Sequence, residues 1–180
     1  MDVLDAFEFP EGNDAALLEK AVLKMTDVFS KATFDVLSDD EPPSIPSEGL
    51  SPEKIEDFEK QVGCQFPEGL RMLYSRYRYL SFSDSFKVFG VHSPEEVGYG
   101  SPWISDQHEK GRDWLVLGQY WRHADGDDLL MDLQSGEVYA YLHEYRGKIE
   151  WYAPSIAAAV FRSVFEVSDE EYAELYEFEG

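Results

Sequence analysis

The spacing of apolar residues changes once along this chain, near residue 80, and this change limits the fold more than any other feature. Before it, apolar residues recur every three or four positions, as in amphipathic helices. After it, short segments alternate with a period of two, which is typical of strands. A last helical segment covers residues 156–165. This order predicts an α+β fold with N-terminal helices, a central antiparallel β-sheet of about five or six strands, and a closing C-terminal helix.

Three helices are predicted before the change of period. Residues 14–32 form an amphipathic segment that we expect to pack on the protein's own core; the alternative is a dimer or partner contact. Ser51-Pro52-Glu53 starts the second helix, because Ser caps free amides, Pro suits the first position and Glu suits the positive end of the dipole. Gly63 is suited to end it. The third helix is predicted to begin at Pro67 and to end near Leu80.

Five strands are predicted, at residues 86–91, 114–118, 128–133, 137–145 and 148–152. Gln134-Ser135-Gly136 joins two of them in a β-hairpin. In the strand at 137–145, the odd positions form an aromatic stripe of Tyr139, Tyr141, His143 and Tyr145, and the even positions are apolar. Either another element, such as the N-terminal helix, covers this stripe, or it is an exposed surface of tyrosines of the kind found at binding hot spots.

Charge limits the kinds of partner. The chain of 180 residues has 37 acidic and 15 basic side chains and a formal net charge of −22. With 43% hydrophobic residues it is too apolar to be disordered. A surface for nucleic acid or anionic membrane needs clustered Lys and Arg, so we expect neither as a direct partner and favour a basic protein.

The charge distribution, the prolines and the pattern of helices and strands together indicate an organisation in four parts. We predict an N-terminal extension with the amphipathic helix at 1–37, an acidic proline-rich linker at 38–50, an α+β domain at 51–165 and an acidic C-terminal tail at 166–180. The tail is either a solvated segment or an electrostatic lure for a cationic partner. No signal sequence or membrane span is evident and there is a single cysteine, so we expect a cytoplasmic protein. We also expect a monomer or a weak homodimer, for which an uncovered tyrosine stripe or N-terminal helix would be a natural surface.

Several motifs in order resemble the SUKH superfamily, which includes Smi/Knr-like proteins. The resemblance covers about residues 51–165. It is carried by Ser51-Pro52-Glu53-Lys54-Ile55-Glu56-Asp57-Phe58-Glu59, Val62-Gly63, Phe66-Pro67-Glu68-Gly69-Leu70, Trp114-Leu115-Val116-Leu117-Gly118, Gly126-Asp127-Asp128-Leu129-Leu130-Met131-Asp132, Gly136-Glu137-Val138-Tyr139, His143-Glu144 and Ser155-Ile156-Ala157. The chain departs from the family pattern at residues 76–82, where no glycine interrupts the sequence.

The resemblance implies a non-enzymatic binding protein. Members of the superfamily are mostly bacterial immunity proteins that block toxins delivered between cells, often nucleases or deaminases. We therefore expect an immunity protein that occludes the active site of a cognate polymorphic toxin, with a basic nuclease-type domain as the favoured target. The alternative is a regulatory adaptor or scaffold like the fungal Smi and Knr cell-wall regulators.

The residues themselves give little support for catalysis. No nucleophile motif and no glycine-rich phosphate loop is present, and we expect no cofactor and no metal. The segment from His123 to Asp128 is rich in oxygen ligands but lacks the spacing of a calcium loop, so a turn explains it more simply. Cys64 is expected to be a small buried hydrophobe, with a reactive thiol as the alternative.

The predicted partner-binding residues are aromatic anchors and nearby acids, which together suit a basic protein surface. They are Tyr99, Trp103, Asp106, Glu109, Trp121, Asp125, Asp127, Asp128, Tyr139, Tyr141 and Tyr145.

Overall fold

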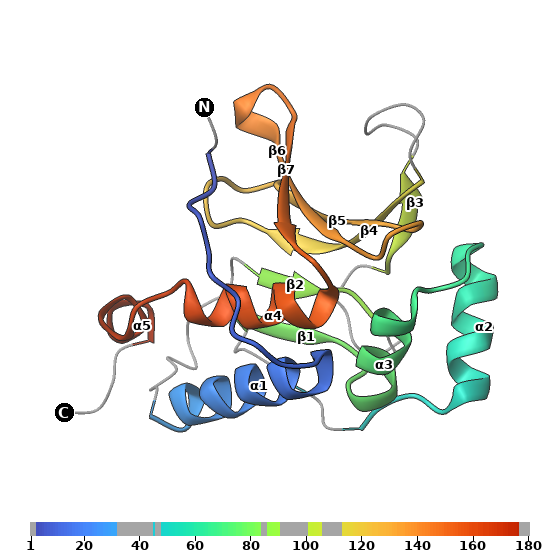
Figure 1. The fold of residues 1–180 in the computed structure, drawn as a ribbon, viewed down its shortest axis with the longest axis horizontal. Coiled ribbons are helices and arrows are strands. Elements are labelled where there is room, and N and C mark those ends of the chain that lie inside the picture. The colour runs from blue at the N-terminus through green and yellow to red at the C-terminus, as the bar shows by residue number, and fades with distance from the viewer. Residues whose placement is uncertain are drawn as a thin grey trace, which may run out of the picture.

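The structure is a computed structural model that describes residues 3–31, 45, 48–83, 86–90, 101–105 and 113–176 (Figure 1). Its helices are α1 (Asp14–Lys31), α2 (Pro52–Val62), α3 (Glu68–Arg76), the 3-10 turn η1 (His143–Tyr145), α4 (Ile156–Phe165) and α5 (Asp169–Tyr176). Its strands are β1 (Leu80–Ser83), β2 (Phe86–Val88), β3 (Trp103–Ser105), β4 (Trp114–Tyr120), β5 (Asp128–Asp132), β6 (Val138–Leu142) and β7 (Lys148–Ala153). The predicted α+β fold is confirmed.

The strands form one antiparallel sheet in the order β1-β2-β4-β5-β6-β7. The short strand β3 also pairs with β4. It pairs with the first half of β4, at Trp114 to Val116, while β2 pairs with the second half, at Gly118 to Tyr120. At the other end of the sheet, β7 is an edge strand that pairs only with β6 along this order.

One face of the sheet, called the inner face, is covered by α4 and α1, which lie side by side beneath β4 to β7 in Figure 1. Helix α4 is apolar on nearly all sides, and its residues from Ile156 to Val164 are all buried. Helix α1 contributes buried Leu18, Ala21 and Met25 to the same core. The first helix therefore packs on the protein's own core, as its apolar spacing predicted.

Local signals in the sequence set most helix ends. The side chain of Asn13 accepts the amide of Ala16 at the start of α1, and Ser51 caps α2 by accepting the amide of Lys54. Gly63 ends α2 in the left-handed region, at φ 88°, where a side chain would be strained. Gly136 takes φ 76° in the hairpin that joins β5 and β6, as predicted.

Three predictions of local structure were wrong. Helix α3 ends at Arg76, and Leu80, which was placed at the end of that helix, begins β1. Strand β3 was not among the five predicted strands. Strand β6 ends at Leu142, three residues before the predicted end at Tyr145, so two members of the predicted stripe, His143 and Tyr145, lie in η1 instead.

The segment Val3–Phe9, called the N-terminal strap, lies along β7 and crosses α4 on its way to α1 (Figure 1). The carboxylate of Glu150 on β7 accepts the amides of Val3 and Leu4 at 2.7 and 2.8 Å. Phe7 packs edge-on against Phe161 of α4, with ring centroids 6.2 Å apart. The strap is thus fixed to both the sheet edge and the helix layer.

A buried arginine links the strap, β7 and α4. Arg162 is 3% exposed. Its guanidinium donates to the carboxylate of Glu166 at 3.0 Å, to the carbonyl of Tyr152 at 2.9 Å and to the carbonyl of Asp5 at 2.6 Å. The hydroxyls of Tyr152 and Tyr120 donate to the same Glu166 carboxylate. Burial, followed by the negative charge of Glu166, raises the pKa of both tyrosines, so they remain neutral donors.

Candidate partner-binding surface

The sheet face opposite α1 and α4, called the outer face, carries a row of large side chains that crosses five strands. Directly opposed residues link Trp103 of β3, Val116 of β4, Leu130 of β5, Tyr139 of β6 and Trp151 of β7. Opposed residues of antiparallel strands point to the same side of the sheet, so these five side chains share a face. The centre of the row is fully buried, whereas Trp103 is 47% and Trp151 43% exposed.

Neighbouring rows extend the outer face. Asp128, Tyr141 and Ile149 oppose one another on β5, β6 and β7. On the other side of the main row, Trp114 opposes Asp132, and its ring meets the ring of Tyr139 edge-on at a centroid distance of 5.1 Å. The outer face therefore combines a small buried cluster with half-buried aromatics and acidic residues at its borders.

One carboxylate orients two aromatic side chains of the outer face. The indole nitrogen of Trp151 donates to Oε1 of Glu137 at 3.1 Å, and the hydroxyl of Tyr139 donates to Oε2 at 3.2 Å. Both rings are thereby held in fixed positions before any partner arrives. Preorganised aromatic anchors lose little entropy on binding, which favours their use as contact residues.

The structure brings four of the predicted binding residues together on the outer face: Trp103, Asp128, Tyr139 and Tyr141. It also adds two residues that the sequence did not single out, Ile149 and Trp151. Their alternation was visible in the predicted strand at 148–152. The side on which they lie depends on their register with β6, which shifts between Val138 and Tyr139 and so could not be predicted locally.

A second group of predicted residues lies where the β4–β5 loop meets η1. Asp127 fixes the position of His143 in η1. Its Oδ1 accepts a hydrogen bond from the backbone amide of His143 at 2.8 Å and also lies 2.8 Å from the ring Nδ1 of His143. Asp127 is fully buried, so it positions this turn and does not face a partner. The rings of His123 and Tyr145 meet edge-on across the two turns at 6.5 Å.

The remaining predicted residues differ in accessibility. Asp125 and Tyr145 are exposed, and Trp121 is half-buried at the start of the loop. Tyr99, Asp106 and Glu109 lie outside the described residues. The predicted residues that the structure describes are therefore divided between the outer face and this second group. We call the second group the η1 tip, because the exposed residues His143 to Arg146 form its outermost turn.

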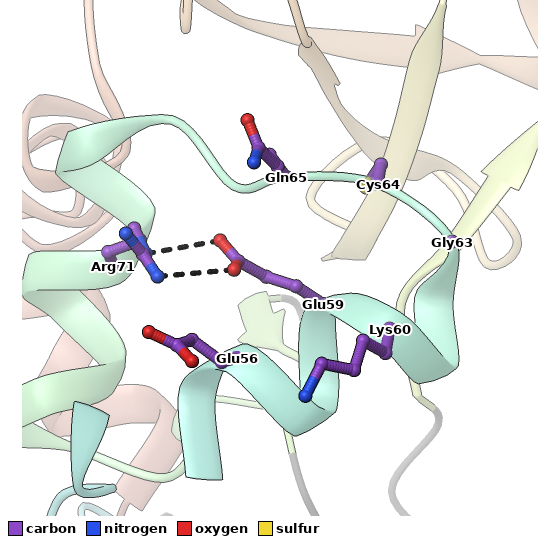
Figure 2. A pocket seen from close by; sticks show the side chains of 7 residues that line it. All are labelled: Glu56, Glu59, Lys60, Gly63, Cys64, Gln65 and Arg71. Carbon is purple, nitrogen blue, oxygen red and sulfur yellow. Dashed lines mark hydrogen bonds and ion pairs between the residues drawn. The ribbon is translucent and has the colours of Figure 1, made fainter. Parts of the chain in front are cut away.

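A separate open pocket of about 540 Å³ lies between α2 and α3 (Figure 2). Its main charged groups bind one another: the guanidinium of Arg71 meets both carboxylate oxygens of Glu59 at 3.1 and 3.2 Å. Glu59 also accepts the backbone amide of Phe66. These bonds fix the connection between the two helices. The ion pair in the pocket therefore has a structural role.

Cys64 at the border of this pocket does not have the properties of a nucleophile. It is half-buried and packs against the core. Burial, followed by the negative charge of Glu59, raises the pKa of its thiol. The reactive thiolate is therefore disfavoured at neutral pH.

The described part of the chain contains no group of three or more His, Cys, Asp or Glu residues placed to hold a metal ion. In the oxygen-rich segment considered from the sequence, Asp127 is directed to His143, while Asp125 and His123 are exposed. Within the same described ranges, no helix is long and apolar enough to cross a membrane.

Comparison with known proteins adds the family. Residues 49–160 match the model of the SMI1 / KNR4 family (SUKH-1). The match begins just before α2 and runs into α4, so it includes the whole sheet and the outer face, whereas the N-terminal strap and α1 lie outside it. No curated protein matches the sequence.

Proposed function

Because the chain belongs to the SMI1 / KNR4 family (SUKH-1), we propose that it is an immunity protein that binds and neutralises a cognate polymorphic bacterial toxin in the cytoplasm. It acts by covering the active site of the toxin and performs no chemistry of its own. The favoured target is a toxin domain with a basic surface, such as a nuclease. The family is in general made up of non-catalytic immunity and regulatory proteins.

The observation that carries this proposal is the outer face. It presents a row of large side chains whose two ends, Trp103 and Trp151, are among the most exposed large hydrophobic side chains of the described residues. Tyr and Trp are enriched at binding hot spots because they supply much contact area with few rotors to immobilise. The Glu137 carboxylate holds two of these aromatics in place, as an inhibitor surface requires.

The charge of the chain supports a basic target. A cleft that attracts phosphate groups also attracts carboxylates, and a net charge of −22 accelerates the encounter with such a cleft. Asp128 and Asp132 lie on the outer face itself, at the border of the aromatic row. Long-range attraction thus guides the partner, and the aromatic residues hold it.

The test is binding of the purified protein to the toxin domain encoded by the neighbouring gene, measured by calorimetry at low and moderate salt beside an assay of toxin activity. We expect one-to-one binding that abolishes activity and weakens as salt increases. Tyr139→Ala should raise the dissociation constant roughly 30-fold or more, as expected for a hot-spot tyrosine. The matched control is Leu23→Ala, which truncates a side chain 63% exposed on α1, away from the outer face.

Three outcomes are informative. Loss of inhibition with Tyr139→Ala and not with Leu23→Ala supports the outer face. Equal inhibition by both variants keeps the immunity function and places the contact elsewhere, with the η1 tip tested next through Tyr145→Ala. An active toxin that the wild-type protein does not bind contradicts the immunity proposal and favours the regulatory adaptor.

A further inference from the structure

An open pocket of about 390 Å³ lies between the N-terminal strap and the edge strand β7. Its lining comes from the strap, from β7 and from α4: Leu4, Asp5, Ala6, Lys148, Ile149, Glu150, Trp151 and Arg162. Ile149 and Trp151 also belong to the outer face, so the pocket continues that face at the sheet edge. A partner seated on the outer face would meet this pocket directly.

The apolar wall of the pocket is fixed in position. The indole of Trp151 is held on one side by its hydrogen bond to Glu137 and on another by the ring of Phe9, which meets it edge-on at 6.0 Å. Ile149 and Leu4 are half-buried beside it. A fixed indole next to aliphatic side chains suits the stem of a long side chain and offers a ring face to a cation.

The other charged side chains that line the pocket already have partners. Lys148 forms an ion pair with Glu150, whose carboxylate also accepts the strap amides of Val3 and Leu4. Arg162 binds Glu166 and two carbonyls, as described above. These groups hold the strap against β7 and leave little net charge inside the pocket.

Asp5 is different from the other charged residues of the pocket. The backbone carbonyl of Asp5 accepts the hydrogen bond from Arg162. Asp5 is exposed, and its carboxylate has no hydrogen bond or ion pair with the rest of the described chain. It therefore adds one uncompensated negative charge at the border of an otherwise neutral, partly apolar pocket. This combination is complementary to a cation on an aliphatic stem.

We propose that this pocket is a binding site for a lysine or arginine side chain of the toxin. The stem lies against Ile149 and Trp151, and the cationic head meets the Asp5 carboxylate. The inference rests on the proposed function for the identity of the partner. It also gives the N-terminal strap, which lies outside the family match, a part in choosing that partner.

The first experiment needs no toxin. The chain has four tryptophans, whose indole N–H signals can be followed separately by NMR in the ¹⁵N-labelled protein. The probe is the blocked peptide Gly-Arg-Gly, with Gly-Glu-Gly as the acidic comparison. We expect the Trp151 signal to move with the arginine peptide and to stay in place with the glutamate peptide.

Asp5→Asn is the decisive variant, because it removes the charge and keeps the backbone carbonyl that binds Arg162. Its matched control is Glu8→Gln, which removes one negative charge from an exposed strap residue that does not line the pocket. Asp5→Asn should abolish the Trp151 response, and Glu8→Gln should leave it unchanged. Unchanged Val3 and Leu4 amide signals would show that the strap is still docked.

The same two variants are then measured against the toxin domain. Asp5→Asn should weaken binding about fivefold and Glu8→Gln less than twofold. Equal effects of the two variants, an equal response of the other indoles, or no Trp151 response at a large excess of the peptide would each overturn the pocket proposal. If the peptide binds at Trp151 but the wild-type protein does not bind the toxin, the proposed function fails and the cation site remains.

Discussion

The two faces of the sheet are built from the same strands but differ in what surrounds them. On the inner face, Leu142 of β6 is fully buried under the helical layer, whereas its neighbour Tyr141 on the outer face is half-buried. At the border of the inner face, Arg162 of α4 forms a hydrogen-bonded ion pair with Glu166. At the borders of the outer face, Trp103 and Trp151 are exposed. The inner face therefore supplies most of the buried core, and in our proposal the outer face supplies the contact with the toxin.

The largest expected effect tests the ion pair at the border of the inner face. Arg162→Met leaves the Glu166 carboxylate, whose side chain is 13% exposed, without its cationic partner, and it frees the Asp5 and Tyr152 carbonyls. We expect a loss of about 3–5 kcal/mol in the free energy of unfolding, measured by urea denaturation. The control Arg122→Met removes a surface ion pair with Glu171 and should cost less than about 1 kcal/mol. Similar losses for both variants would contradict a structural role specific to Arg162.

The second prediction compares the two faces within one strand. Leu142→Ala removes a fully buried side chain and should cost about 2–5 kcal/mol of stability. Tyr139→Ala loses an edge-on contact with Trp114 and part of a half-buried ring, and should cost about 1–2 kcal/mol. Toxin binding should show the opposite order once unfolding is accounted for. If Tyr139→Ala destabilises the protein as much as Leu142→Ala, the outer face is a second core and not a recognition surface.

The third prediction uses pH to weaken the attachment of the strap at the sheet edge, between the two faces. Burial raises the pKa of Glu150, but hydrogen bonds from Lys148 and from the Leu4 and Val3 amides lower it more, so the pKa is below its ordinary value in the folded protein. The carboxylate therefore stabilises the fold above its unfolded pKa, near 4.5, and this contribution disappears as pH falls through the folded value.

This prediction is checked by urea denaturation between pH 7 and 3. Glu150→Gln should be less stable than the wild type at pH 7, and the difference should shrink towards pH 3. Glu8→Gln, on the same strap side of the molecule, removes a carboxylate that forms none of these bonds and serves as the control. A difference between Glu150→Gln and wild type that stays constant with pH would show that the carboxylate charge does not hold the strap.

Much of the fold was predictable because its signals are local. Ser51-Pro52 and Gly63 define the ends of α2 within a few residues, and the turn at Gly136 fixes a hairpin. The end of β6 was not predictable, because the alternation of tyrosines continues past Leu142. The strand stops where the carboxylate of Asp127, 16 residues earlier in the chain, binds the amide and ring of His143.

The candidate site was predictable only in part, for a similar reason. The sequence shows which residues are aromatic, but the register of the paired strands determines which residues lie beside them. Trp151 comes opposite Tyr139 only because the pairing of β6 and β7 shifts by one residue after Val138. The contribution of the strap to the sheet edge depends on bonds between residues far apart in the sequence, such as Leu4 and Glu150, which are 146 positions apart.

The smallest expected effect concerns the turn that joins β6 and β7 and so sets that register. Arg146 adopts φ 66°, which is strained for a residue with a side chain, and it is exposed. Glycine adopts this conformation without the steric cost but has more freedom in the unfolded chain, so Arg146→Gly should change the unfolding free energy by less than about 1 kcal/mol. Because the turn is kept, Tyr139 and Trp151 should remain opposed and toxin binding through the outer face should be unchanged. A large loss of binding would instead identify the Arg146 side chain, and with it the η1 tip, as part of the contact.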